Sequence, residues 1–283
     1  MTQRQGVPIS VLDLSILREG ASSADALTQT TTLAQCADAC GYKRFWVAEH
    51  HNMPSVACTA PPVLIGHLAA LTSRINVGSG GVMLPNHAPL VVAEQFAMLE
   101  ALHPGRIDVG IGRAPGTDQR TAAAVRRSEG ALGAEDFPTD LFELMDLLGD
   151  RRFDTTIGDH FKATPAASSY PKIFLLGSSG YSAHLAAKLG LPFGFAHHFD
   201  MGGTFEAAEI YRSRFVPSHI LSEPYMIVTA NVLAADTNEE ALWHAKSSRL
   251  TGYLRRTGRF LPLPSADDAA RHPDIAESER MPS

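Results

Sequence analysis

The sequence has few cysteines, no long run of hydrophobic residues and no excess of basic charge. Its three cysteines are Cys36, Cys40 and Cys58, in a chain of 283 residues that is far too large to need disulfide bonds for stability. Such an odd, small number of thiols indicates a reducing compartment, so we expect a cytoplasmic protein. Cys36 and Cys40 are one turn apart in a predicted helix, and ordinary helix packing explains them.

The missing hydrophobic runs and the charge balance exclude two further classes of protein. The polar residues 1–7 lead into a short apolar strand, which predicts neither a signal peptide nor a membrane span. The chain has 24 Lys and Arg against 30 Asp and Glu, a net charge of -6, and no basic stripe that could follow a phosphate backbone. We therefore expect small-molecule partners and no nucleic acid.

What the sequence does contain is a repeated alternation of strand and helix patterns. With 45% hydrophobic residues, the chain can bury one large core. Helical stripes such as Leu141, Leu144, Met145 and Leu148 separate the strand patterns. Repeated βα units predict an α/β fold with parallel strands, either an open sheet or a closed barrel. The seven predicted strands are 7–15, 44–48, 75–84, 106–112, 172–177, 192–197 and 225–234.

Two segments depart from this alternation. Residues from about 114 to 170 are too many for a plain crossover, and a helix start at Pro138-Thr139-Asp140 indicates an inserted helical segment over the barrel mouth. After a helix at 238–256, residues 258–283 contain four prolines among charges and no strand pattern. We expect one (β/α) domain at 1–257 that contains this inserted segment, and a Pro-rich, charged tail at 258–283. If the fold is an eight-stranded barrel, the chain is truncated before the eighth strand, which leaves two open strand edges.

The second predicted strand ends in Glu49, His50 and His51. In a βα barrel, the carboxyl end of a strand is the catalytic face. Because side chains alternate along a strand, we expect only one of the two histidines to point inward. Imidazole suits proton transfer near neutral pH, and the alternative is a structural histidine.

Glycines and a cation mark the next two predicted strands. Gly80 and Gly81 interrupt a β-branched strand, which indicates either clearance for a flat ligand or a bend of the barrel. Gly110 and Gly112 resemble the start of a dinucleotide fingerprint, but the third glycine comes one residue late, so we reject that interpretation. Arg113 ends this strand and is either a fixed cation for a phosphate or a surface arginine in an ion pair.

The fifth and sixth predicted strands also end in polar residues. A turn of Gly177, Ser178, Ser179, Gly180 and Tyr181 opens into a helix, where free N–H groups and the helix dipole favour a phosphate, although many such serines are only helix caps. A second imidazole pair, at 197 and 198, raises the alternative of a metal-dependent barrel hydrolase. The first strand has no H-x-H pair and later strand ends offer no acidic ligand, so we expect no metal.

Taken together, four ordered motifs resemble the bacterial luciferase-like flavin-dependent monooxygenases, and most of all their antibiotic-tailoring branch. The resemblance runs from about residue 7 to 258, and its motifs are residues 49–51, 80–85, 102–107 and 176–181. It implies a TIM-type (β/α)8 barrel, here lacking the last βα unit. It also implies a homodimer that uses reduced FMN, supplied by a transient flavin reductase, and O2 to oxygenate a small apolar substrate. A deazaflavin stays open as the cofactor.

The resemblance also assigns roles to individual residues. His50 matches the catalytic histidine of the family, and Gly80, Gly81 and Met83 match the strand where a non-proline cis peptide faces the flavin ring. Family members normally continue into a final strand and helix, so a non-catalytic flavin-binding homologue with a shortened barrel is the alternative. The residues that match the phosphate site are Arg113, Gly177, Ser178, Ser179, Gly180 and Tyr181.

Overall fold

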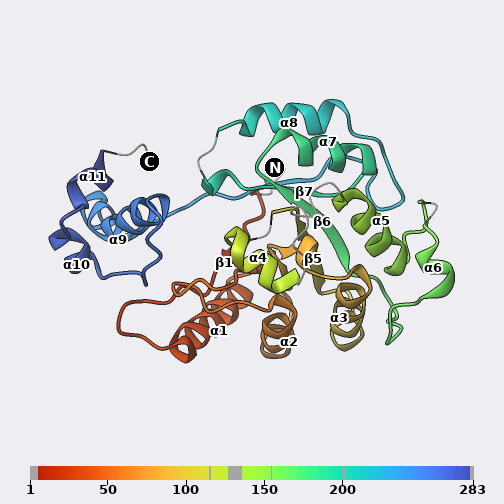
Figure 1. Ribbon diagram of the computed structural model, residues 1–283, viewed down its shortest axis with the longest axis horizontal. Coiled ribbons are helices and arrows are strands. Elements are labelled where there is room, and N and C mark those ends of the chain that lie inside the picture. Colours follow the sequence, from red (N-terminus) through yellow and green to blue (C-terminus); the bar gives the residue numbers. More distant parts are fainter. Residues whose placement is uncertain (1–5, 115, 127–135, 154, 200–201, 281–283) are drawn as a thin grey trace, which may run out of the picture.

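The computed structural model describes residues 6–114, 116–126, 136–153, 155–199 and 202–280 (Figure 1). Strands and helices alternate along most of this length. The strands are β1 Val11–Asp13, β2 Arg44–Val47, β3 Asn76–Ser79, β4 Val82–Met83, β5 Ile107–Gly112, β6 Lys172–Gly177, β7 Phe193–Phe195 and β8 Met226–Val228. The helices are α1 Ser23–Ala39, α2 Pro61–Leu71, η1 Leu84–Asn86, α3 Pro89–Leu102, α4 Gln119–Arg126, α5 Phe137–Leu147, α6 Ile157–His160, α7 Gly180–Leu189, η2 His197–Phe199, α8 Thr204–Ser213, α9 Asn238–Arg256, α10 Ala266–Arg271 and α11 Ile275–Glu279.

All strands belong to one parallel sheet. Its order is β1-β2-β3-β5-β6-β7-β8, and β4 pairs with β5 beyond the end of β3. Each crossover leads to the neighbouring strand, so the carboxyl ends of all the strands lie at one edge. Each of the seven predicted strand regions contains a strand, and the third contains two. Within the described residues no pairing joins β8 to β1, so the sheet is open there.

The helices cover the outer face of the curved sheet. In Figure 1, α1, α2 and α3 lie side by side along one flank, and α7 and α8 lie together along the other. Phe45 and Val47 of β2 point outward into the core that these helices form with the sheet, where they are fully buried with Leu68 and Phe96. This packing explains the alternating apolar residues of each strand.

The predicted insertion at about 114–170 divides into two parts with different roles. Helix α5 buries Leu141, Leu144 and Met145 in the main core and packs against α3, so it serves as an ordinary crossover helix. Helix α4 instead contacts η1, which follows β4 at the strand-end edge. The sequence predicted that the whole segment 114–170 lies over the carboxyl ends of the strands. Among its described helices, α4 lies there and α5 does not. Residues 115, 127–135 and 154 of the segment lie outside the described residues.

The inner face of the sheet holds a buried ionic network. Arg44 Nε lies 3.1 Å from Asp108 Oδ2, and Trp46 Nε1 donates a hydrogen bond of 3.0 Å to the same oxygen. Burial raises the pKa of Asp108, even though Arg44 opposes this effect. Phe174 and Tyr225 flank the Arg44 guanidinium at 5.0 and 5.4 Å. These side chains fill the inner face opposite the helices.

Residues 258–280 form more than a plain tail. Helices α10 and α11 pack on α9, where Leu250, Leu254 and Ala269 make a small separate core. Before α10, the backbone of Leu263 exchanges two hydrogen bonds with residues 17 and 19, at 2.8 and 2.9 Å. The sequence predicted that the domain ends at residue 257, between α9 and α10. In the structure α9 packs with α10 and α11, so the two sides of this predicted boundary are in contact (Figure 1).

The structure also locates the features that are scarce in the sequence. All three cysteines are free thiols: Cys36 lies in α1, Cys40 caps its C-terminus, and Cys58 is buried. Burial raises the pKa of Cys58 to about 12, which keeps this thiol protonated at neutral pH. None of the helices in the described part of the chain is long and apolar enough to cross a membrane.

Asp38 ties the end of α1 to the turn before β3. Its carboxylate accepts hydrogen bonds from the backbone N–H groups of Ser73, Arg74 and Ile75, at 2.8 to 3.0 Å, and from the Ser73 hydroxyl at 3.0 Å. Burial alone would raise the pKa of Asp38, but these bonds outweigh it and lower the pKa from 3.8 to about 2.

We predict that Asp38→Asn lowers the free energy of unfolding by about 2 kcal/mol at pH 7, because an amide cannot accept all of these bonds. Since the pKa of Asp38 is depressed in the folded state, its contribution is present above pH 3.8 and is lost as the pH falls toward about 2. Urea unfolding between pH 2 and 7 measures both effects. The exposed Asp236→Asn is the control, and equal stability of the two variants at pH 7 would contradict the prediction.

Candidate functional site

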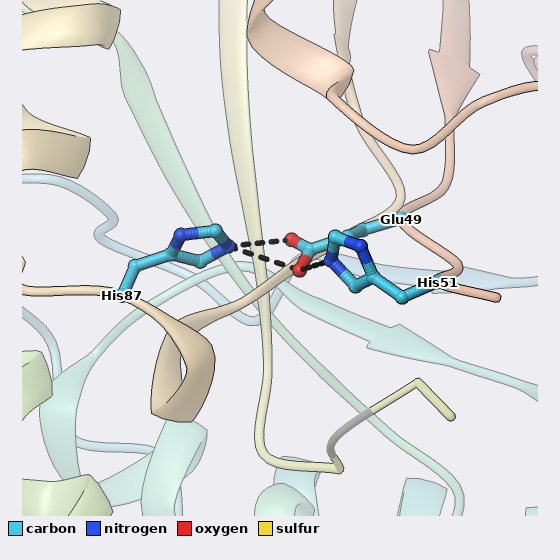
Figure 2. Close-up of side chains that lie close together, drawn as sticks. All are labelled: Glu49, His51 and His87. Atoms are coloured by element: carbon cyan, nitrogen blue, oxygen red, sulfur yellow. Dashed lines mark hydrogen bonds and ion pairs between the residues drawn. The ribbon is translucent and has the colours of Figure 1, made fainter. Parts of the chain in front are cut away.

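Glu49 lies at the centre of a cluster where β2 opens into its loop (Figure 2). Its side chain is 1% exposed. Oε1 accepts hydrogen bonds from His51 Nε2 at 2.7 Å and from Asn86 Nδ2 at 3.0 Å, while Oε2 accepts one from the Met83 backbone N–H at 3.0 Å. His87 Nε2 lies 2.9 and 3.0 Å from the two oxygens. Four donors from two strand-end loops therefore converge on one carboxylate.

The charge of Glu49 is stabilised by these donors. Burial by itself would raise the pKa of Glu49, but the hydrogen bond and charge of His87, with the bonds from Asn86 and Met83, bring the pKa below its ordinary value. Glu49 is therefore ionised at neutral pH. His51 and His87 are partly exposed, at 21% and 29%, so the cluster has a buried anion and a solvent-accessible rim.

His50 lies between Glu49 and His51 but is not among the described hydrogen-bond partners of the Glu49 carboxylate. Its Nδ1 is buried without a hydrogen bond of ordinary geometry to any described residue. Burial and the positive charge of Arg255 lower the pKa of His50 and outweigh the opposing pull of the Ala48 carbonyl and Glu49. The imidazole is thus neutral at neutral pH.

Gly80 and Gly81 lie directly beside the Glu49 cluster. The peptide bond between them is cis, as the resemblance implied. The backbone N–H of Glu49 donates to the Gly81 carbonyl at 3.1 Å. A Cβ on Gly80 would lie 2.7 Å from Leu12 Cδ1, and one on Gly81 would lie 2.7 Å from the Gly110 carbonyl oxygen. Close approach of the β5 backbone accounts for Gly81, whereas at Gly80 the nearest atom belongs to the flexible end of the Leu12 side chain.

Arg113 and Tyr181 come together from separate strand ends. The Arg113 guanidinium carbon lies 4.3 Å from the centre of the Tyr181 ring, and no carboxylate pairs with Arg113 in the part of the chain that the structure describes. Ser179 is the N-cap of α7 but makes no capping hydrogen bond with its side chain. Gly177 ends β6, where a Cβ would collide with Ser182. This corner therefore presents a free cation, a free hydroxyl and the unpaired N–H groups of a helix start.

The four histidines that suggested a hydrolase do not form one set of metal ligands within the described residues, although His50 lies close enough to His198 for its charge to lower the pKa of His198. Among the described residues, His197 bonds to Thr204 at 2.9 Å and His198 to Thr229 at 2.5 Å. The described part of the chain has one set of three side chains with metal-ligand atoms within 4.8 Å of one another, and it consists of Glu49, His51 and His87. The metal set considered from the sequence is therefore wrong in its membership.

Comparison with known proteins identifies the family. A model of the luciferase-like monooxygenases matches residues 9–281. The chain belongs to the luciferase-like monooxygenase family. The family membership that the sequence motifs suggested is thereby confirmed, and with it an oxidoreductase of the flavin-dependent type.

Individual relatives agree with this assignment. A luciferase-like monooxygenase of Escherichia coli strain K12 is 49% identical over 91% of this chain and 76% of its own length. An N-acetyl-S-alkylcysteine monooxygenase of Bacillus subtilis strain 168 is 41% identical over 93% of this chain and 78% of its own. The crystal structure of apo-MsnO8 is 38% identical, covers 98% of this chain and 80% of its own, and has a TM-score of 0.87.

A more distant solved structure shares the fold and holds a flavin. It is the oxygenating constituent of 3,6-diketocamphane monooxygenase from Pseudomonas putida in complex with FMN, 18% identical, with a TM-score of 0.63 over 89% of this chain and 74% of its own. The open parallel sheet with its helices is thus a luciferase-like fold.

Sequence reasoning missed part of this luciferase-like site. Glu49 was noticed as a strand-end acid, but its partners Asn86 and His87 were not considered, because they lie 37 and 38 residues further along the chain. Arg255 was also missed, since the end of α9 carries no motif. His87 follows the Gly80–Pro85 strand closely, and this position was the one sequence feature that could have marked it as a site residue. Its contact with Glu49 is visible only in the tertiary structure.

Proposed function

We propose that this protein is an FMN-dependent monooxygenase that uses reduced flavin and O2 to oxygenate a small organic substrate. The observation that supports this most is that a neutral His50 with a buried Nδ1 at one strand end accompanies a free cation and a helix start at another. One arrangement suits proton transfer and the other suits an anion, and both lie at the same edge of the sheet.

The residues of the α7 corner suit the phosphate of FMN. Arg113 offers a guanidinium already oriented on the Tyr181 ring, and Ser179 offers a hydroxyl that no cap bond uses. Ser178 and Gly180 belong to the same turn at the start of α7, whose backbone N–H groups and dipole favour an anion. FMN would thus be anchored by Gly177, Ser178, Ser179, Gly180, Tyr181 and Arg113.

Beside a bound flavin, His50 would hold or move a proton at Nδ1, because its lowered pKa keeps the ring neutral near pH 7. The strand of Gly80, Gly81 and Met83 would support the flavin ring. When bound, reduced FMN supplies the electrons that activate O2, and a separate flavin reductase would supply that FMN. The protein's own task is to anchor the phosphate, orient the ring and exclude water.

The substrate is proposed to be a small, largely apolar molecule. The relative named N-acetyl-S-alkylcysteine monooxygenase supports S-alkylated amino acids as the first compounds to screen, followed by long-chain aldehydes. A deazaflavin is the alternative cofactor, and binding of FMN and deazaflavin to the same preparation would distinguish the two.

We also propose that the fold is a TIM-type barrel that lacks the βα unit that would close it between β8 and β1. These two strands share no described pairing. The labels β1 to β8 do not count barrel strands, because β3 and β4 both pair with β5.

The exposed apolar residues Val91, Met98 and Leu102 line one face of α3 and suit a homodimer interface. Sedimentation that finds only monomers would contradict the dimer.

We predict that Arg113→Ala weakens FMN binding by about tenfold to one hundredfold, because a charge-assisted contact to the phosphate contributes about 1.5 to 3 kcal/mol. Flavin fluorescence quenching at moderate salt measures this change. Arg212→Ala, on the exposed face of α8, is the matched control. Equal affinity of all three proteins would place the phosphate elsewhere.

We predict that His50→Ala abolishes most oxygenated product while FMN affinity changes less than threefold, because the imidazole serves the reaction rather than the anchoring. Product is measured with a flavin reductase, O2 and the substrate panel. Undiminished turnover in His50→Ala would refute the role of His50. FMN binding by the wild type without any product would support the non-catalytic, flavin-binding alternative.

A further inference from the structure

Glu49 connects three loops that come from different strands. Its own loop follows β2 and continues through His51 to Asn52. The second loop, from Met83 to His87, supplies donors to the Glu49 carboxylate, as Figure 2 shows for His87. The third follows β5 and is attached to the first, since Thr117 Oγ1 donates to the His51 carbonyl at 2.8 Å and Asn52 Nδ2 donates to Thr121 Oγ1 at 3.1 Å.

The third loop also packs directly on Glu49. Gly116 has a φ of 66°, and a Cβ there would lie 2.9 Å from the Glu49 carbonyl oxygen and 3.0 Å from Met83 Cγ. This close approach requires glycine at that position. The backbone of Glu49 and the side chain of Met83 together form the surface on which Gly116 rests.

Each of these loops carries a residue of the proposed flavin site. His50 lies between Glu49 and His51, the strand of Gly80 and Gly81 leads into Met83, and Arg113 precedes Gly116. We propose that Glu49 is a positioning residue whose carboxylate holds the first two loops together, so that the third loop, which is attached to the first, is placed with them and the flavin pocket is assembled. This inference rests on the proposed flavin function, although the effect on the loops themselves does not require flavin.

A carboxylate is required because all of its neighbours are donors. A glutamine has the same shape, but its NH2 group would face either the Met83 N–H or the donors from His51 and Asn86. At least one buried donor would then lose its acceptor, which lowers the stability of the cluster by about 1 to 3 kcal/mol. Glu49→Gln therefore changes the hydrogen bonding of the cluster while it leaves the volume of the side chain almost unchanged.

The donor set also distinguishes this role from metal binding. Glu49, His51 and His87 place three ligand atoms within 4.8 Å. However, the Nδ2 amino group of Asn86 and the backbone N–H of Met83 also donate to the carboxylate, and neither N–H group can coordinate a cation. Both oxygens of Glu49 are thus satisfied without a cation, which favours a hydrogen-bonded hub over a metal centre.

The first test compares wild type, Glu49→Gln and Glu206→Gln, an identical change on the exposed surface of α8. We expect Glu49→Gln to weaken FMN binding by about tenfold to one hundredfold, which corresponds to one lost charge-assisted hydrogen bond. The visible circular dichroism of saturating bound FMN should also change, because the ring is held differently. Glu206→Gln should match the wild type in both measurements.

Hydrogen exchange of the flavin-free chain provides a readout that does not depend on the cofactor. In Glu49→Gln we expect faster amide exchange at residues 83–87 and 116–121, with unchanged exchange in the buried strands β5 and β6. If the wild type fails to bind FMN, the proposed function fails. Faster exchange confined to these loops would still support the positioning role of Glu49, and unchanged exchange would overturn it.

Two further variants cover the case in which Glu49→Gln does not fold. Glu49→Asp keeps the charge with a shorter reach and should restore part of the FMN affinity, while the half-exposed His87→Ala should lose about threefold to tenfold. Wild-type affinity and exchange in both variants would overturn the proposal. So would stoichiometric Zn²⁺ binding that raises the melting temperature of the wild type and disappears in His87→Ala, because the cluster would then be a metal site.

Discussion

Parallel pairing of the strands determines where chemistry can occur in this molecule. Because each crossover returns the chain to the same end of the sheet, the carboxyl ends of β2, β4, β5 and β6 meet at one edge. The loops that leave this edge carry His50, Met83, Arg113 and Ser179. The opposite edge and the inner face are occupied instead by buried packing and the Arg44–Asp108 network.

Buried charge imposes a second constraint on the same edge. An ionised carboxylate without water must be surrounded by donors, and Glu49 obtains them only if the loops after β2 and β4 adopt one arrangement. The cost of leaving Glu49 unsatisfied therefore opposes any displacement of either loop. His50, next to it, has a buried Nδ1 without a hydrogen bond of ordinary geometry to any described residue, so its surroundings differ from those of Glu49.

Much of the fold followed from local patterns. The strand regions, the helix at 238–256 and the stripe of Leu141, Leu144 and Met145 were all predicted correctly, because burial against one neighbouring layer imposes a period on the sequence. The place of α5 was not, since a helical stripe shows which face is buried but not which element covers it. Short helices such as α10 and α11 were missed because their composition resembles that of a loop.

Local sequence was enough to predict the parallel βα organisation, the family and the strand ends that carry the candidate site residues, because these depend on short-range periodicity and on motifs of contiguous residues. Three features became visible in the folded chain alone: the sheet is open between the described β1 and β8, Arg113 stacks on Tyr181, and His87 contacts Glu49. Those contacts join residues tens of positions apart, and their geometry depends on how each loop leaves the sheet, which no local pattern records.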